Sequence, residues 1–426
     1  MYDPFHILGH QSFPPKSLES IEKLADLNVQ LPTRSRIERA QQRAREFVLA
    51  CRTGETEFSL TRGGSSSCFS RCFGLFNIHL LGLGHEISGL EATLAARICA
   101  DLDETLAKRK AQGADPRQDK HYLQLLTFSL SALATIGKVA DAPLEDHIKP
   151  LLLNADNLDN FLTQAGVFEG RATSGNLAMF HAILLWHAQI YLGLDTSSAI
   201  SKWNDLHLQR RNRFGFWGSS SNMTYLQFQN GFHQYEMLNY PTLRLDEGAE
   251  LAARNAALMA DRAGQFAPYP GGGGCYDFDA VALIAASKNS RKYAPLLTRT
   301  LDTILSAQND DGGFCESRIV RPRSPKNLFR QIAHCIRPEK PGATERLRYF
   351  ATLQRPRHDI VTTHWTSRHR RWDESDLWDT WFRLMAIATI DKVLAAGSGV
   401  TWRFIDYPGI GYKPDVPKTQ TPERNA

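Results

Sequence analysis

The sequence lacks the features that define several large classes of protein. No apolar run of about 18 residues is free of polar interruption, so no transmembrane helix is expected. The first six residues lack the basic and apolar regions of a signal peptide. The seven cysteines are odd in number and irregularly spaced, which fits a reducing compartment better than a disulfide framework. We therefore expect a soluble protein with a cytoplasmic location.

Common cofactor motifs are also missing. The sequence contains no P-loop, no dinucleotide-binding glycine pattern after a strand and no His-Glu-x-x-His motif. The net charge of +5 is small for 426 residues and does not indicate a nucleic-acid partner. With 42% hydrophobic residues, the chain can bury a large core, and global disorder is not expected.

A repeat is the main feature that the sequence does contain. Strand signals are almost absent, and six segments open with small or polar residues and continue into an apolar helix. The openings lie near residues 68, 121, 177, 231, 277 and 376, and the first five are about 50 residues apart. Amphipathic helices are predicted between them, at 36–50, 90–110, 144–164, 197–209, 246–262 and 293–308.

This alternation predicts an all-α fold, an (α/α)6 toroid of six inner and six outer helices. The residues that open the inner helices would then gather around one mouth of the ring. An open helical solenoid or a bundle of unrelated helices is the alternative. We expect an N-terminal extension at 1–35, a single toroid domain at 36–407 and a flexible C-terminal tail at 408–426.

A basic insertion at 317–373 interrupts the toroid before its last repeat. From residue 317 to residue 358 there are eleven basic residues against two acidic ones, and five prolines break the segment. Such a charge run is either a solvated surface or a lid over the mouth. As a lid, it would attract an anionic substrate through Arg318, Arg321 and Arg323. The insertion could also make a peripheral membrane contact.

The most specific pattern lies between residues 270 and 315. The segment 308–314, Gln-Asn-Asp-Asp-Gly-Gly-Phe, resembles the Gln-x-x-x-Gly-Gly-Phe/Trp repeat of squalene-hopene-type cyclases and protein prenyltransferase β subunits. The segment 274–280, Gly-Cys-Tyr-Asp-Phe-Asp-Ala, resembles the inner-helix opening of the same superfamily of α/α toroids. The resemblance is weak at 374–391 and only architectural elsewhere.

This resemblance implies acid chemistry at Asp279. Class II terpenoid cyclases take their general acid from the middle residue of Asp-x-Asp-Asp, a position that Asp279 would hold, with Asp277 before it and Ala280 in place of the third aspartate. The zinc prenyltransferases carry Asp-x-Cys and a later histidine, and here Asp279 and Asp379 stand at those two positions. The zinc set is therefore not preserved and no metal site is predicted, although a set of carboxylates would suit Mg²⁺ as a cofactor.

Other residues leave other interpretations open. His233 and Glu236 are three apart on a predicted inner helix and share a face, so they could form the acid–base pair of a glycan lyase or epimerase, or simply a satisfied buried pair. Aromatic residues near the openings could stabilise carbocations, stack on sugars or pack in the core. These aromatic residues are Trp217, Phe232, Tyr235, Phe278, Trp378 and Trp381.

Three functions follow from these observations. The first is a terpenoid cyclase-like or prenyl-substrate enzyme, of the isomerase or lyase class, that uses aspartate acid chemistry at the mouth. The second is a glycan-directed lyase, hydrolase or epimerase that acts on an acidic sugar. The third is a non-catalytic toroid that binds a partner or a lipid-linked intermediate. The resemblance at 270–315 favours the first.

Overall fold

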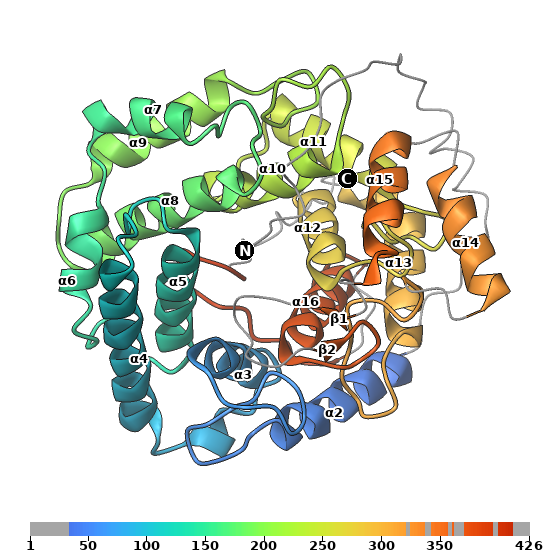
Figure 1. Cartoon of the computed structure of the whole chain (residues 1–426), viewed down its shortest axis with the longest axis horizontal. Helices are drawn as coiled ribbons and strands as arrows, with labels where there is room; N and C mark the ends of the chain where they lie inside the picture. Colours follow the sequence, from blue (N-terminus) through green and yellow to red (C-terminus); the bar gives the residue numbers. More distant parts are fainter. Residues whose placement is uncertain are drawn as a thin grey trace, which may run out of the picture.

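The computed structural model describes residues 34–320, 324–336, 342–356, 360–361, 370–394 and 399–411. In these residues the helices form a ring of two layers (Figure 1). Each inner helix contacts the next one along the chain, and the last, α16, contacts the first, α3, which closes the ring. The predicted (α/α)6 toroid is therefore confirmed. The inner helices are α3 (Cys68–Leu80), α5 (Lys120–Thr135), α8 (Ser174–Tyr191), α10 (Tyr225–Leu238), α12 (Gly274–Ala285) and α16 (Leu377–Leu394).

The outer layer explains the second sequence pattern. An outer helix such as α4 buries only a narrow stripe, which includes Leu94, Ile98 and Leu102, whereas the inner helices are buried on almost every side. The outer helices are α2 (Arg34–Ala50), α4 (Glu91–Ala111), α7 (Ala155–Gln164), α9 (Ser197–Gln209), α11 (Glu247–Met259) and α13 (Ala294–Ser306). The short helices are η1 (Gly84–Ile87), α6 (Glu145–Ile148), η2 (Lys149–Leu151) and η3 (Ser290–Tyr293).

The glycine-containing segment 308–314 joins the two ends of the ring. The side-chain amide of Gln308 donates to the backbone oxygen of Ala40 on α2, at 2.8 Å. The backbone N–H of Phe314 donates to Thr380 Oγ1 on α16, at 3.0 Å. Gly312 has a φ of +90°, and a Cβ there would lie 2.1 Å from the backbone oxygen of Arg43, so only glycine fits. The motif that carries the sequence resemblance thus has a structural role here.

The start of one inner helix differs from the prediction. The helix α10 begins at Tyr225, six residues before the predicted opening at Gly231, because Thr224 and Gln227 form a reciprocal capping box. Gly231 instead lies inside the helix, where a Cβ would be 2.3 Å from the ring of Phe216. This glycine allows close packing and does not end a helix.

The insertion contains secondary structure that was not predicted. It holds α14 (Pro325–Cys335), α15 (Ala343–Leu353) and a two-stranded antiparallel sheet of β1 (Ile360–Val361) and β2 (Arg370–Arg371). The carboxylate of Glu345 on α15 accepts hydrogen bonds from the backbone N–H groups of Tyr225 and Leu226. The insertion therefore packs against the N-terminal end of α10.

A C-terminal segment, residues 399–411, crosses the opposite end of the ring. Its backbone and side chains bond the last turns of four inner helices, through the pairs Phe404–His79, Trp402–Asp391, Tyr407–His187 and Gly411–Glu236. Residues 408–411 are buried, so the predicted start of a flexible tail at 408 was wrong; residues 412–426 lie outside the described residues.

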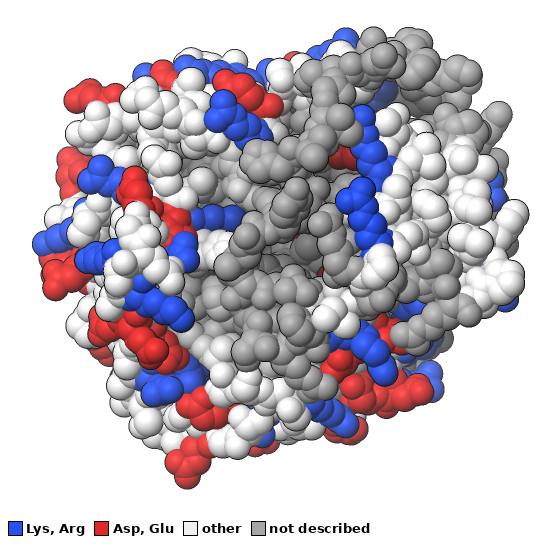
Figure 2. Space-filling view, viewed as in Figure 1, with Lys and Arg blue, Asp and Glu red and all other residues white. Residues whose placement is uncertain are grey.

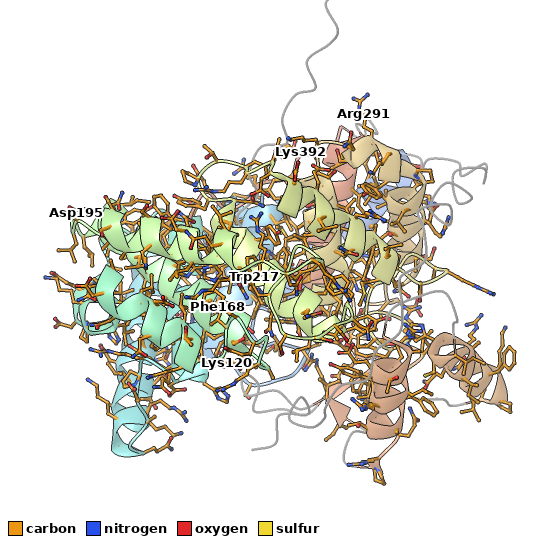
Figure 3. The ribbon with its side chains drawn as sticks, turned by 90° about the horizontal axis from the view of Figure 1, so that it is seen from above. Lys120, Phe168, Asp195, Trp217, Arg291 and Lys392 are labelled. Carbon is orange, nitrogen blue, oxygen red and sulfur yellow. The ribbon has the colours of Figure 1, made fainter. Side chains whose placement is uncertain are left out.

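The two ends of the ring are distinct in side view (Figure 3). Lys120, at the start of α5, lies on the lower side, and Lys392, near the end of α16, lies on the upper side. The insertion is on the lower side with the helix starts, and the C-terminal segment bonds the helix ends. Among the described residues, no helix has the length and apolar character needed to cross a membrane.

Candidate functional site

One stripe of α10 remains partly exposed although the helix is in the inner layer. Leu226, Gln229 and His233 are partly exposed at intervals of three and four residues, whereas most of their neighbours are buried. Since the outer helices cover the opposite side, this stripe faces the centre of the ring. Glu236 lies one turn beyond His233 on the same face, and its carboxyl is buried.

A matching stripe runs along α12. Cys275 and Ala282 are partly exposed and seven residues apart, and Asp279 lies between them on the same face. The helices α10 and α12 are neighbours in the ring. The structure thus brings together three predicted site residues, His233, Glu236 and Asp279, on adjoining central faces.

Asp279 is a buried carboxyl group without a hydrogen bond. Neither of its oxygens has a hydrogen-bonding partner among the described residues. Burial raises the pKa of Asp279 well above its usual value, and the nearby carboxyls of Glu236 and Asp277 raise it further. These surroundings favour the protonated form of Asp279, which is the form that a proton donor requires.

The surroundings of Glu236 favour its charged form more than those of Asp279 do. Burial raises its pKa, but the neighbouring His233 and a hydrogen bond of 3.3 Å from the Gly411 backbone N–H both oppose that shift. Its second oxygen is 3.7 Å from His233 Nδ1, too far for a hydrogen bond, and neither atom has another partner among the described residues. Two carboxyls in unequal surroundings are a recurring arrangement for acid–base chemistry.

Asp277 has a different environment from Asp279. Its carboxylate pairs with the guanidinium of Arg383 on α16 and accepts a hydrogen bond of 2.9 Å from the Phe266 backbone N–H. Burial nevertheless raises the pKa of Asp277 to about 6. Because its oxygens are already bonded to protein groups, Asp277 links α12 to α16.

Asp376 and Asp379 form a second paired cluster with Arg370. Asp376 pairs with the guanidinium of Arg370 and caps α16 through a hydrogen bond of 2.7 Å from the Asp379 backbone N–H. Asp379 Oδ2 lies 3.7 Å from Arg370 Nη2. Burial raises the pKa of Asp379 well above its usual value, and the carboxyls of Asp376 and Glu316 add to that effect. The four aspartates of α12 and the start of α16 are thus divided into three that pair with a guanidinium, Asp277, Asp376 and Asp379, and a separate Asp279.

These pairings make a poor site for Mg²⁺. Arg370 and Arg383 already neutralise the carboxylates of Asp376 and Asp277, and a divalent cation would have to displace them. Among the residues that the structure describes, no group of three or more His, Cys, Asp or Glu side chains is arranged to hold a metal ion.

Of the three arginines predicted to bind an anionic substrate, the structure describes Arg318. Arg318 donates to Asn309 Oδ1 at 2.6 Å and to the Gln308 backbone oxygen at 2.8 Å, so it braces the 308–314 segment. Arg321 and Arg323 lie outside the described residues. The structure therefore assigns Arg318 to the 308–314 segment, and substrate contacts by Arg321 and Arg323 stay predictions.

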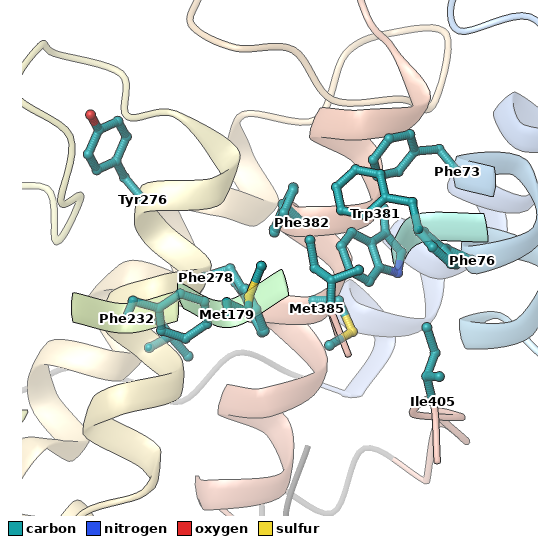
Figure 4. Packing of buried hydrophobic residues seen from close by; sticks show 14 of the residues in the cluster. Phe73, Phe76, Met179, Phe232, Tyr276, Phe278, Trp381, Phe382, Met385 and Ile405 are labelled. Carbon is teal, nitrogen blue, oxygen red and sulfur yellow. The ribbon is translucent and has the colours of Figure 1, made fainter. Parts of the chain in front are cut away.

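The predicted aromatic residues divide into two groups. Trp217 and Tyr235 are buried and bond backbone oxygens, Trp217 to His207 at 2.9 Å and Tyr235 to Gly215 at 2.6 Å, so they act in the core. The others lie on inner helices near Asp279 or along α16, and most pack on one another (Figure 4). Ring centroids are 5.6 Å apart for Phe232–Phe278, 4.7 Å for Trp378–Phe382 and 4.7 Å for Trp381–Phe382.

Sequence reasoning missed the two buried arginines. Arg370 and Arg383 are 2% and 1% exposed. Their guanidinium groups pair with Asp376, Asp379 and Asp277. A signal was present, because Arg383 lies in the mainly apolar helix 377–394, four residues after Asp379. A guanidinium in such a position requires a buried carboxylate partner.

Comparisons with known proteins give structural neighbours only. No family model and no curated protein matches the chain. A solved glycosidase variant in complex with glucose matches with a TM-score of 0.47 at 13% identity, over 84% of this chain and 97% of that one. A mutant of unsaturated glucuronyl hydrolase from Streptococcus agalactiae matches with a TM-score of 0.48 at 11% identity, over 90% and 98% of the two chains.

Proposed function

We propose that this chain is a glycan-processing enzyme, a hydrolase or lyase, in which Asp279 donates a proton and Glu236 with His233 accepts one. The observation that carries the proposal is the pair of buried carboxyls on the central faces of α10 and α12. Asp279 has no group that stabilises its charge, whereas Glu236 has two. This difference favours the protonated form more strongly at Asp279 than at Glu236, as an acid beside a base requires.

The polar character of the central stripe supports a sugar substrate. Asp279, Glu236 Oε2 and His233 Nδ1 are buried polar atoms that lack hydrogen bonds among the described residues. Each such atom is costly unless a ligand supplies a partner. Sugar hydroxyls both donate and accept hydrogen bonds and would satisfy all three groups, whereas a hydrocarbon would leave them unpaired.

A second candidate is the isoprenoid chemistry that the sequence resemblance implies. The observation that favours it is the ring cluster next to Asp279, in which Phe278 packs between Phe232 and Phe382 with centroid distances of 5.6 and 5.7 Å. Such rings stabilise carbocations. This alternative uses the same acid but does not require His233 or Glu236.

One experiment separates the two candidates. Purified protein is incubated with hexuronic-acid oligosaccharides, with saturated and unsaturated ends, and separately with squalene and farnesyl diphosphate; product release and thermal stabilisation are measured. We expect turnover of a uronic-acid oligosaccharide that is lost in Asp279→Asn and Glu236→Gln and retained in the control Asp141→Asn, which removes a carboxylate that is 71% exposed. Turnover of an isoprenoid that survives Glu236→Gln would establish the second candidate. Turnover that survives Asp279→Asn would exclude both.

A further inference from the structure

The helix α14 has its polar face turned inward and its apolar face turned outward. Gln331 and His334 are buried, whereas Phe329, Ile332 and Ile336 at its end point to solvent, with Phe329 72% and Ile336 64% exposed. The inward face is held by specific contacts, since the Gln331 amide donates to the backbone oxygen of Ile319 at 2.6 Å. The orientation of the helix is therefore fixed by its polar side.

The exposed apolar residues of α14 lie along one side of the helix, at intervals of three and four residues. Leu328 on α14 is exposed with them, and Leu347 on α15 and Ile360 on β1 are exposed elsewhere in the insertion. Elsewhere in the described residues only Ile190 is a large apolar side chain with comparable exposure, at 47%. A concentration of exposed apolar side chains of this kind indicates a binding surface for another molecule or a membrane. We call the four exposed residues of α14, 328, 329, 332 and 336, the apolar patch.

The exposed charged residues in the described parts of α14 and α15 are all basic. Lys326 and Arg330 on α14 and Arg348 on α15 are exposed. Glu345, the acidic residue within the described parts of α14 and α15, turns away and bonds the N-terminus of α10. Figure 2 shows the surface over α14, at the right of the view, as largely uncharged, with basic side chains at its edges.

These features match an anionic lipid surface. We propose that the apolar patch inserts into the interface of a bilayer that carries anionic phospholipids, with the basic residues bonded to their headgroups. An amphipathic helix with Phe, Ile and Leu on one face and Lys and Arg beside them is the usual element for such binding. A second copy of the chain fits less well, because a two-fold contact would bring the same basic side chains against each other.

The position of α14 determines which end of the ring would face a bound bilayer. In side view α14 and α15 project from the ring at lower right, on the side where the inner helices begin (Figure 3). Glu345 fixes α15 to the start of α10, the helix that carries His233 and Glu236. A bound bilayer would therefore lie on the side of the helix starts and leave the C-terminal segment on the far side.

Vesicle sedimentation with the full chain tests this proposal. We expect binding to phosphatidylcholine vesicles that contain one-third phosphatidylserine, and little binding to pure phosphatidylcholine. The combined change Phe329→Ser, Ile332→Ser and Ile336→Ser should weaken binding at least about tenfold. Lys326→Gln with Arg330→Gln should weaken it and reduce its dependence on salt. Ile190→Ser, which removes an exposed isoleucine outside the insertion, should leave binding unchanged.

Other outcomes overturn the proposal. Absence of binding to anionic vesicles, or binding that survives the triple serine change, would exclude a lipid contact through this patch. A dimer in sedimentation equilibrium that dissociates in the triple serine variant, without vesicle binding, would assign the patch to a second copy. Circular dichroism of each variant verifies that the fold is intact, and these outcomes do not depend on the proposed glycan chemistry.

Discussion

Asp277 and Asp279 are separated by one residue on α12 yet lie in different environments. Successive residues of a helix are rotated by about 100°, so side chains two apart point in nearly opposite directions. Asp277 therefore faces Arg383 and the backbone of Phe266, while Asp279 lies on the stripe that faces the ring centre. This difference between two identical side chains is set by position alone.

A pair of substitutions tests that difference. In Asp279→Asn the fold should be at least as stable as in the parent at pH 7. The folded-state pKa of Asp279 lies above its unfolded value, so its proton stabilises the fold at low pH and this contribution decreases as pH rises. Activity should fall at least about 100-fold. Urea unfolding and turnover measure the two effects.

The matched control is Asp277→Asn. It leaves the buried guanidinium of Arg383 without a carboxylate, and we expect it to cost about 3 kcal/mol of unfolding free energy. Equal losses of stability in the two variants would contradict the assignment of Asp277 to structure and Asp279 to chemistry.

His187 should contribute to acid sensitivity. Burial lowers its pKa to about 4, and its Nδ1 lies 2.8 Å from the Tyr407 hydroxyl. Between pH 4 and pH 6.5, His187 is protonated in the unfolded chain, where the pKa of histidine is about 6.5, but neutral in the folded chain. Stability from neutral His187 is therefore complete above about pH 6.5 and lost as pH falls, by about 2 kcal/mol at pH 5.

The measurement compares unfolding free energies at pH 7 and pH 5. His187→Gln should reduce the difference between the two pH values by about 2 kcal/mol. His85→Gln should leave it unchanged, because the His85 side chain is 71% exposed. An unchanged difference in the His187 variant would show that this histidine does not titrate differently on folding.

At the scale of elements, the sequence predicted the helices better than their contacts. Apolar periodicity located all six inner and all six outer helices, because one turn of a helix repeats within a few residues. The start of α10 was misplaced because a glycine within a tightly packed helix was taken for a helix boundary. Pairing between distant residues, such as Asp277 with Arg383 106 positions later, leaves no local pattern.

The packing of the C-terminal segment, residues 399–411, could not be predicted from local sequence patterns either. Ile405, Tyr407 and Ile410 are buried, but they alternate with polar and small residues in a stretch that contains proline and glycine. Only the assembled ring provides the surface on which they pack. For the candidate site, the sequence identified Asp279, His233 and Glu236 as candidate catalytic residues. It did not show that they lie on adjoining faces at the centre of the ring.

The close contact between α8 and α10 predicts that a larger side chain at Gly175 destabilises the fold. Gly175 lies near the start of α8, and a Cβ there would be 2.2 Å from the backbone oxygen of Asn230. Gly175→Ala should destabilise the fold by about 1 to 3 kcal/mol, because backbone must move, and this exceeds the gain of up to about 1 kcal/mol in helix propensity.

Gly84→Ala is the matched control. A Cβ at Gly84 meets nothing within 4 Å, so this variant should change the unfolding free energy by no more than about 0.5 kcal/mol. If both alanine variants unfold at the same denaturant concentration, α8 and α10 are not in the close contact described.

At the scale of the whole molecule, the two ends of the ring are unequal. The C-terminal segment bonds the ends of α3, α8, α10 and α16, and a Cβ at Gly409 would be 2.6 Å from Ser131 on α5, so the segment reaches five inner helices. The C-terminal segment therefore lies across the end of the ring at which the inner helices end. If the proposed function holds, a substrate reaches Asp279 from the side where the inner helices begin.

This asymmetry predicts the order in which products form. A glycan that enters from one side presents its chain end to Asp279, so one residue or a short fragment should be released at each step. Chromatography of a defined uronic-acid oligosaccharide at early times should show the shortest product together with a substrate that is shorter by the same unit. Internal fragments of intermediate length at the first time points would contradict end-on access, because they require a chain that lies across the site with both ends free.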